Sequence, residues 1–260
     1  MYFKYRKALR PSTLLLFSLL YSIISSAQPT TVEVGHFTKV IVSPHIELIL
    51  EEGNEEKVTL ENMKVNRKEV NVRVIGNTLR IYLDHAKTYT RQQKKIKGGN
   101  NFNEPYYSGT QLTARVSYKA LKKLSIRGEE KATCVSEIKR KKFRLKVFGE
   151  SDVEIAALEA QKMKTSLFGE NKLKIESGSV KSHVLKAYGE NKVKARGLKT
   201  IHTKTGSYGE NEYVLNVTNE LQVAAMGESE ISYYGGAKLK RGLVIGENDI
   251  YEYIPVVVKN

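Results

Sequence analysis

The amino-acid sequence predicts an all-β fold, a right-handed parallel β-helix with coils of about 20 residues. Two observations predict it: a dipeptide that recurs at near-even intervals, and alternation of apolar and polar residues on both sides of each copy. The first Gly-Glu pair stands at positions 128 and 129. The later copies are Gly149-Glu150, Gly169-Glu170, Gly189-Glu190, Gly209-Glu210, Gly227-Glu228 and Gly246-Glu247, in steps of 21, 20, 20, 20, 18 and 19 residues. Seven such copies indicate an internal repeat.

The flanks of each copy alternate with a period of two, which is typical of half-buried strands. Leu145 and Val147 precede one copy, and Val153 and Ile155 follow it. A lone unit cannot bury its apolar face, whereas stacked units can. No segment keeps the 3.6-residue apolar period of a helical solenoid, and a propeller blade takes about 40 residues. Each unit is therefore expected to hold two or three short strands separated by corners.

The Gly-Glu pair is expected to mark one corner of each coil. Glycine tolerates positive φ, so it can turn the chain where other residues are strained. Asn or Ser follows each glutamate from position 151 onward, and stacked Asn side chains form ladders that satisfy backbone groups at turns. The aromatic residue before the glycine should form an outward stack. This stack comprises Phe148, Phe168, Tyr188 and Tyr208.

The glutamate row needs electrostatic relief. Coils lie about 4.8 Å apart, and carboxylates at that spacing repel by roughly 1 kcal/mol in water. Lys131, Lys172 and Lys192 stand two residues after their glutamates, whereas Glu212, Glu230 and Asp249 replace lysine in later coils, so relief by lysine should fail there. Ca²⁺ prefers oxygen ligands and is an alternative source of relief. The expected ligands are Glu210, Glu212, Glu228 and Glu230; no other cofactor is expected.

The two ends of the chain suggest export and a single domain. Residues 1–27 carry a basic start, an apolar run over 14–24 and Ser25-Ser26-Ala27, which together predict a cleaved signal peptide; an uncleaved anchor is the alternative. Residues 28–260 then form one β-solenoid domain. Its N-terminal coils and cap occupy 28–120, with a long polar loop at 84–111, and the regular Gly-Glu repeats occupy 121–255. The alternative for 84–111 is a disordered insertion.

Three stretches of the chain carry a resemblance to a known family. They are "FTKVIVSPHIELILEEG", "VIGNTLRIYL" and "YKALKKLSIRGEE", the last leading into the glycine-centred repeats. Together with the signal peptide they resemble the family called putative auto-transporter adhesin, head GIN domain, over about residues 32–255. The resemblance implies a β-helical exported protein of Gram-negative bacteria, in the periplasm or on the outer surface, and brings no catalytic residues. Many members have Gly-Ser or Gly-Ala corners where this chain has Gly-Glu.

The sequence offers no constellation typical of an enzyme. None of the five histidines has metal-ligand spacing, and one cysteine cannot build a structural zinc site. His183 shares its position in the repeat with Phe143 and Met163, which predicts a core or edge histidine. Cys134 falls in register with apolar residues and should be buried and inert. A glycoside hydrolase or lyase is the alternative, with neighbouring carboxylates such as Glu190 and Glu210 as its acid and base.

Charge is the remaining functional signal. Residues 28–208 carry a net charge of +15, and residues 209–260 carry −4. We expect a non-catalytic binding or scaffolding protein of the cell envelope that binds acidic glycans or other polyanions through its basic half. The expected contact residues are Lys94, Lys95 and Lys97, with Lys139, Arg140, Lys141, Lys142 and Arg144. A cell-surface glycan or an envelope protein is the expected partner, self-assembly is the competing mechanism, and no specific nucleic-acid partner or transmembrane span is expected after signal cleavage.

Overall fold

A computed structural model describes residues 29–254, so the predicted signal peptide lies outside the described residues. The fold is almost entirely β, with one short 3₁₀ helix, η2 (Arg67–Glu69). The first strands are β1 (Thr30–Glu33), β2 (Lys39–Val42), β3 (Ile46–Glu52), β4 (Lys57–Glu61), β5 (Val70–Ile75), β6 (Thr78–Leu83), β7 (Gln92–Lys97) and β8 (Asn100–Pro105). They are followed by β9 (Leu112–Tyr118), β10 (Lys123–Gly128), β11 (Ala132–Gly149), β12 (Asp152–Gly169), β13 (Lys172–Gly189), β14 (Asn191–Tyr234), β15 (Lys238–Ile245) and β16 (Asn248–Glu252).

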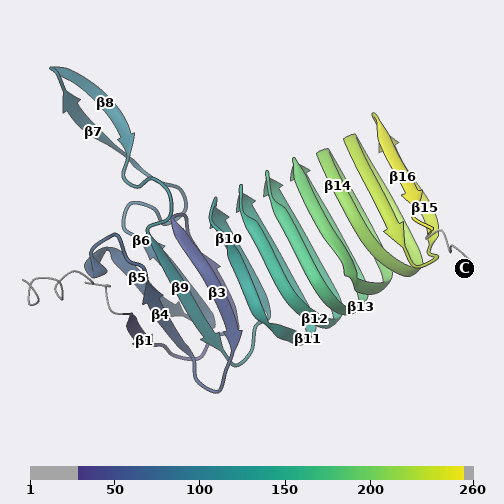
Figure 1. Cartoon of the computed structure of the whole chain (residues 1–260), viewed down its shortest axis with the longest axis horizontal. Helices are drawn as coiled ribbons and strands as arrows, with labels where there is room; N and C mark the ends of the chain where they lie inside the picture. Colours follow the sequence, from purple (N-terminus) through teal and green to yellow (C-terminus); the bar gives the residue numbers. More distant parts are fainter. Residues whose placement is uncertain (1–28, 255–260) are drawn as a thin grey trace, which may run out of the picture.

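The repeats stack as a parallel β-solenoid, which confirms the predicted fold class (Figure 1). Gly128 pairs with Gly149, Gly149 with Gly169, and Gly169 with Gly189, so each coil lies in register with the next. From β11 to β12 the pairing covers residues 132–134, 137–140 and 142–149, with a register shift after Cys134. β11 and β12 therefore each comprise three paired segments, which agrees with the two or three short strands expected for each unit.

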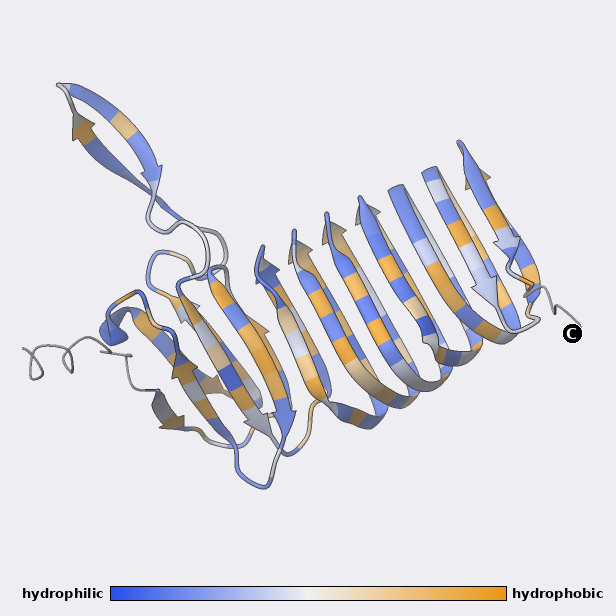
Figure 2. Ribbon diagram, viewed as in Figure 1, coloured by the Kyte–Doolittle hydropathy of each residue, from blue (hydrophilic) through white to orange (hydrophobic). Residues whose placement is uncertain are grey.

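The core is a column of inward-facing side chains inside these coils. Figure 2 shows the apolar and polar bands that alternate along each strand. Leu145, Val147, Val153 and Ile155 are all fully buried, as the period-two pattern predicts. Apolar burial is the main source of stability for such a stack, because a single coil has no partner surface of its own.

The corner glycines are required by both backbone angle and space. Gly169 has φ of +106°, a conformation that residues with a Cβ rarely adopt. A Cβ at this position would lie 2.2 Å from the carbonyl oxygen of Gly149 in the preceding coil. The glycine therefore lets the chain turn while adjacent coils keep the close approach that their hydrogen bonds need.

A ladder of asparagines satisfies the buried side of the same corner. Asn191 Oδ1 accepts from the backbone N–H of Asn171 at 3.2 Å and from Asn171 Nδ2 at 3.0 Å. Asn211 Oδ1 receives the same two bonds from Asn191, at 3.1 Å each. Outside the corner, Phe148, Phe168, Tyr188 and Tyr208 stack with ring centroids 4.9, 5.0 and 4.8 Å apart. The predicted ladder and aromatic stack are both confirmed.

The N-terminal strands close one end of the solenoid. β2 continues the parallel stack onto β6, and β3 continues it onto β9. β5 then pairs antiparallel with β6 through a turn at Gly76, and β4 pairs antiparallel with β9. This switch from parallel to antiparallel pairing ends the stack at β1, β4 and β5.

The polar segment at 84–111 contains an antiparallel hairpin. β7 and β8 pair from Gln92 with Pro105 to Lys97 with Asn100, as a two-stranded sheet separate from the main one. Figure 1 shows the hairpin extending away from the body of the solenoid. Its strands contain no run of apolar residues that would form a core.

Candidate functional site

The corner glutamates form an exposed row along the solenoid. In the part of the chain that the structure describes, no ion pair or hydrogen bond reaches a side-chain oxygen of Glu150, Glu170 or Glu190. The lysines that were expected to neutralise the row pair elsewhere. Lys131 Nζ lies 2.9 Å from Glu154, and Lys192 pairs with Glu212. The expectation that Lys131 and Lys192 neutralise the corner glutamates is therefore wrong, because each pairs with a glutamate outside the corner row.

The later coils bring the predicted calcium ligands to one acidic groove. Glu210, Glu212, Glu228 and Glu230 line a hollow of about 740 Å³ that also includes Glu190. The Tyr251 hydroxyl donates to Glu230 Oε1 at 2.5 Å, and Lys192 pairs with Glu212. Among residues 29–254, no group of three or more His, Cys, Asp or Glu side chains is arranged to hold a metal ion. Calcium binding at these residues stays a prediction.

The structure does not bring the predicted basic residues together. Lys94, Lys95 and Lys97 belong to the separate β7–β8 sheet, where Lys95 Nζ lies 2.8 Å from Glu104. The other five belong to β11, and the bend near Lys141 divides them between two hollows. The first hollow is lined by Lys139, Arg140 and Lys141, and the second by Lys142 and Arg144.

Two of these β11 side chains are already engaged. Lys139 Nζ lies 2.6 Å from Glu159. Arg140 donates from Nη2 to the Lys119 carbonyl at 2.8 Å and lies 3.6 Å from Glu52. Lys141, Lys142 and Arg144 are exposed and have no ion pair within the described residues. These three are the predicted contact residues that remain free to meet an anion.

The second hollow is more basic than the sequence analysis indicates. It measures about 450 Å³, and seven of its eight lining residues are Lys or Arg. We call this hollow the basic groove. Its lining residues are Lys39, Lys122, Lys123, Lys142, Phe143, Arg144, Lys162 and Lys164. Part of the basic groove could have been predicted from the sequence, because Lys123, Arg144 and Lys164 each stand five residues before a corner glycine.

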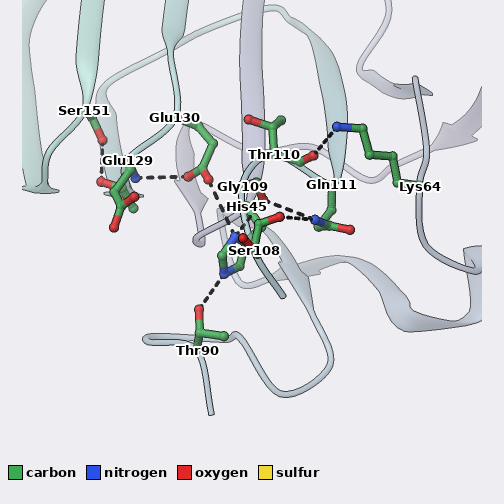
Figure 3. Close-up of polar contacts among 11 residues, drawn as sticks. His45, Lys64, Thr90, Ser108, Gly109, Thr110, Gln111, Glu129, Glu130 and Ser151 are labelled. Atoms are coloured by element: carbon green, nitrogen blue, oxygen red, sulfur yellow. Dashed lines mark hydrogen bonds and ion pairs between the residues drawn. The ribbon is translucent and has the colours of Figure 1, made fainter. Parts of the chain in front are cut away.

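A polar cluster fixes the base of the hairpin segment (Figure 3). His45 Nδ1 lies 2.9 Å from the Gly109 carbonyl, and its Nε2 lies 2.6 Å from Thr90 Oγ1. A carbonyl only accepts, so Nδ1 carries the proton, and in the neutral ring Nε2 accepts from Thr90. Glu130 Oε1 lies 3.7 Å from Nδ1. The ring thus ties both ends of the 84–111 segment to the turn before β3, a role that the sequence analysis missed.

Two buried titratable side chains, those of His183 and Cys134, belong to the core of the solenoid. His183 is buried, packs in register with Met163 and contacts Thr165 Oγ1 at 3.0 Å; its burial lowers the pKa to about 4. Cys134 is buried in register with Ile155, and burial raises the pKa of its thiol to about 12. A neutral imidazole and a protonated thiol in the core are poor candidates for catalysis at neutral pH. The predicted core position of His183 and the predicted burial of Cys134 are confirmed.

The fold defines the class: a parallel β-solenoid with one N-terminal cap and a lengthwise basic groove. The family described as putative auto-transporter adhesin, head GIN domain, matches residues 36–237. The chain belongs to this family, as the resemblance in its sequence implied. A comparison with curated proteins finds no match.

Solved structures share the fold at low sequence identity. A putative adhesin from Bacteroides fragilis has a TM-score of 0.73 and 17% identity, over 87% of this chain and 96% of that chain. A putative lipid binding protein from Parabacteroides distasonis has a TM-score of 0.60 and 17% identity, over the same shares. A putative adhesin from Parabacteroides merdae has a TM-score of 0.57 and 15% identity, again over 87% and 96%. At these identities the likeness shows the fold alone. No helix in the described residues is long and apolar enough to cross a membrane.

Proposed function

We propose that this chain is a non-catalytic, adhesin-like binding protein of the cell envelope that attaches to acidic glycans through its basic half. The observation that carries the proposal is the exposed and unpaired state of Lys141, Lys142 and Arg144, within a region of net charge +15. Clustered cations that lack internal partners attract a polyanion and pay little desolvation cost for lost ion pairs. The names of the family and of two structural neighbours support an adhesin role.

A carbohydrate-active enzyme is the second candidate function. The acidic groove, which includes Glu190 and Glu210, is the observation that favours it. A glycosidase needs two carboxylates with distinct roles and environments. Here equivalent glutamates recur at every corner, and a ladder of identical exposed groups gives no such division of roles. Product release from a glycan panel would establish the enzyme and contradict the binding proposal.

The test is binding of the purified chain to acidic and neutral glycans, including lipopolysaccharide, at low and high salt. We expect binding to the acidic glycans alone, and we expect it to weaken at least tenfold at high salt because salt screens exposed charges. The variant K141E/K142E/R144E should lose this binding. Binding that is insensitive to salt would favour apolar self-assembly or a protein partner and would contradict the proposal.

Anionic lipid is the competing ligand, because its headgroups carry the same negative charge as an acidic glycan. One structural neighbour is described as a putative lipid binding protein, so vesicles containing phosphatidylglycerol belong in the same panel. A glycan site should bind a soluble acidic polysaccharide at least as well as these vesicles. Stronger binding to the vesicles would move the proposed ligand from glycan to membrane surface.

A further inference from the structure

The basic groove contains a ladder of cations that crosses four adjacent strands. Lys39 on β2 pairs with Lys123 on β10, Lys123 pairs with Arg144 on β11, and Arg144 pairs with Lys164 on β12. Neighbouring strands lie about 4.8 Å apart, so the four side chains are spaced evenly along about 14 Å of the solenoid axis. Lys39 on β2 and Lys164 on β12 are the two ends of this row, so the ladder extends from the N-terminal strands to the regular coils.

A second, shorter column runs beside this ladder. Lys142 on β11 pairs in register with Lys162 on β12. Lys122 also lines the groove, but it falls at the position of Phe143 and outside this column, because Lys123 pairs with Arg144. Between the two columns Phe143 points inward and is buried. The groove is therefore a hollow lined by cations on either side of Phe143, with no carboxylate among its lining residues.

Within residues 29–254, none of these seven basic side chains takes part in an ion pair or in a side-chain hydrogen bond. Some lysines elsewhere on the solenoid behave differently, since Lys131, Lys139 and Lys174 each meet a glutamate. The pKa of Lys123 is lowered by its partial burial and then by the charges of Lys146, Arg144 and Lys39. The fold gains nothing from this crowding of like charges, so an external anion is the natural partner.

We propose that the basic groove binds a single acidic polysaccharide chain lying along the solenoid axis, with its anionic groups against Lys39, Lys123, Arg144 and Lys164. This assignment rests on the proposed function and names its site. The even spacing of the cations along one direction favours a linear polymer. The concave shape of the groove disfavours a membrane, because a flat bilayer surface meets the rims of a hollow and leaves its floor uncovered.

The experiment measures the affinity of the purified full chain for dextran sulfate, with uncharged dextran as the matched neutral polymer. The groove variant is K39Q/K123Q/R144Q/K164Q. The control variant is K172Q/K174Q/K192Q/K194Q, which removes the same number of charges from another face of the solenoid, where Asp152 and Glu154 are interleaved with the lysines. We expect the groove variant to lose about 30-fold in affinity and the control variant less than threefold, because only close charge pairs contribute appreciably.

Folding is checked for each variant by its melting temperature and circular dichroism. The variant K39R/K123R/K164R keeps every charge and should bind within about twofold of the wild type, because the attraction of a polyanion depends mainly on the number of cations it meets. If this charge-preserving variant fails to bind while remaining folded, shape rather than charge governs recognition and the assignment is wrong.

The outcomes separate the site from the function. A loss of affinity for dextran sulfate in the groove variant alone supports both the groove as the binding site and polyanion binding as the function. Equal loss in the groove and control variants would overturn the groove as the site, while leaving polyanion binding by the basic half intact. Absence of wild-type binding to dextran sulfate would overturn both. Tighter binding to phosphatidylglycerol vesicles, lost in the groove variant, would overturn the polysaccharide and assign the groove to anionic lipid.

Discussion

The Gly-Glu-Asn corner and the basic groove both repeat one kind of residue from coil to coil, but different forces explain them. At the corner, Gly169 and Asn191 are fixed by the backbone angle, by the lack of space for a Cβ and by buried hydrogen bonds. In the groove, Lys123 and Arg144 have like charges as neighbours and no internal partner. The corner column is required by the fold. The groove column opposes the fold weakly, which is the reason for proposing an external anion as its partner.

The largest expected effect is at the corner glycine. Gly169→Ala should lower the free energy of unfolding by about 4 kcal/mol, because the Cβ clashes with the Gly149 carbonyl and φ is positive. Gly76→Ala is the matched control: its φ is also positive, but no atom lies within 4 Å of the added Cβ, so the loss should be about 1 kcal/mol. Urea unfolding measures the stability of both variants. Equal losses of unfolding free energy would show that the close approach of adjacent coils at Gly169 is unimportant.

The next effect is at the asparagine ladder. Asn191→Ala should lower the free energy of unfolding by about 3 kcal/mol, because the buried backbone N–H and Nδ2 of Asn171 lose their acceptor. Asn219→Ala changes an exposed asparagine of the same solenoid and should cost less than about 0.5 kcal/mol. The comparison uses the same denaturation measurement. If Asn191→Ala lowers the free energy of unfolding no more than Asn219→Ala does, the asparagine ladder does not stabilise the fold.

Buried His183 makes the interior of the coil sensitive to pH. Burial lowers its folded pKa to about 4, below the ordinary value of 6.5, so the unfolded chain binds the extra proton between these values. Stability from this group is complete above pH 6.5 and falls as the pH drops toward 4, by at most about 3 kcal/mol.

His183→Met places at this position the residue that the preceding coil has in register. The variant should lose most of the slope of unfolding free energy against pH between 6.5 and 4, whatever its stability at neutral pH. Denaturant melts at several pH values measure this slope. An unchanged slope would mean that other groups cause the acid sensitivity.

The smallest effect has the opposite sign and belongs to the groove. Lys123→Gln removes the cation that lies between Lys39 and Arg144, so the free energy of unfolding should rise by up to about 1 kcal/mol at low salt. The gain should vanish at high salt, where screening removes the repulsion. Lys174→Gln, which breaks a pair with Glu176, should give no gain. A loss at Lys123 would show that the ladder stabilises the fold.

The regular half of the fold was predictable because one interval repeats. The interval of 20 residues placed the glycine corner, the asparagine ladder and the registers of Cys134 and His183 correctly, since parallel coils bring equivalent positions together. The basic groove was predictable only in part. Lys39 lies outside the repeat and joins the ladder through the long-range pairing of β2 with β10, which no local pattern reveals.

The side-chain partners of charged residues were the least predictable feature. The sequence places Lys131 and Lys192 near corner glutamates, but long flexible side chains reach across coils to Glu154 and Glu212 instead. The role of His45 was also hidden, because its partners Thr90 and Gly109 come from distant positions of the chain.

The most direct test of the basic groove is a lysine footprint. Acylation rates of individual lysines would be measured by mass spectrometry with and without dextran sulfate. We expect strong protection of Lys39, Lys123, Lys162 and Lys164, with Lys172, Lys174 and Lys194 unchanged, because the polymer covers one face only. Protection spread evenly over all lysines, or confined to Lys94 and Lys95 on the hairpin, would contradict it.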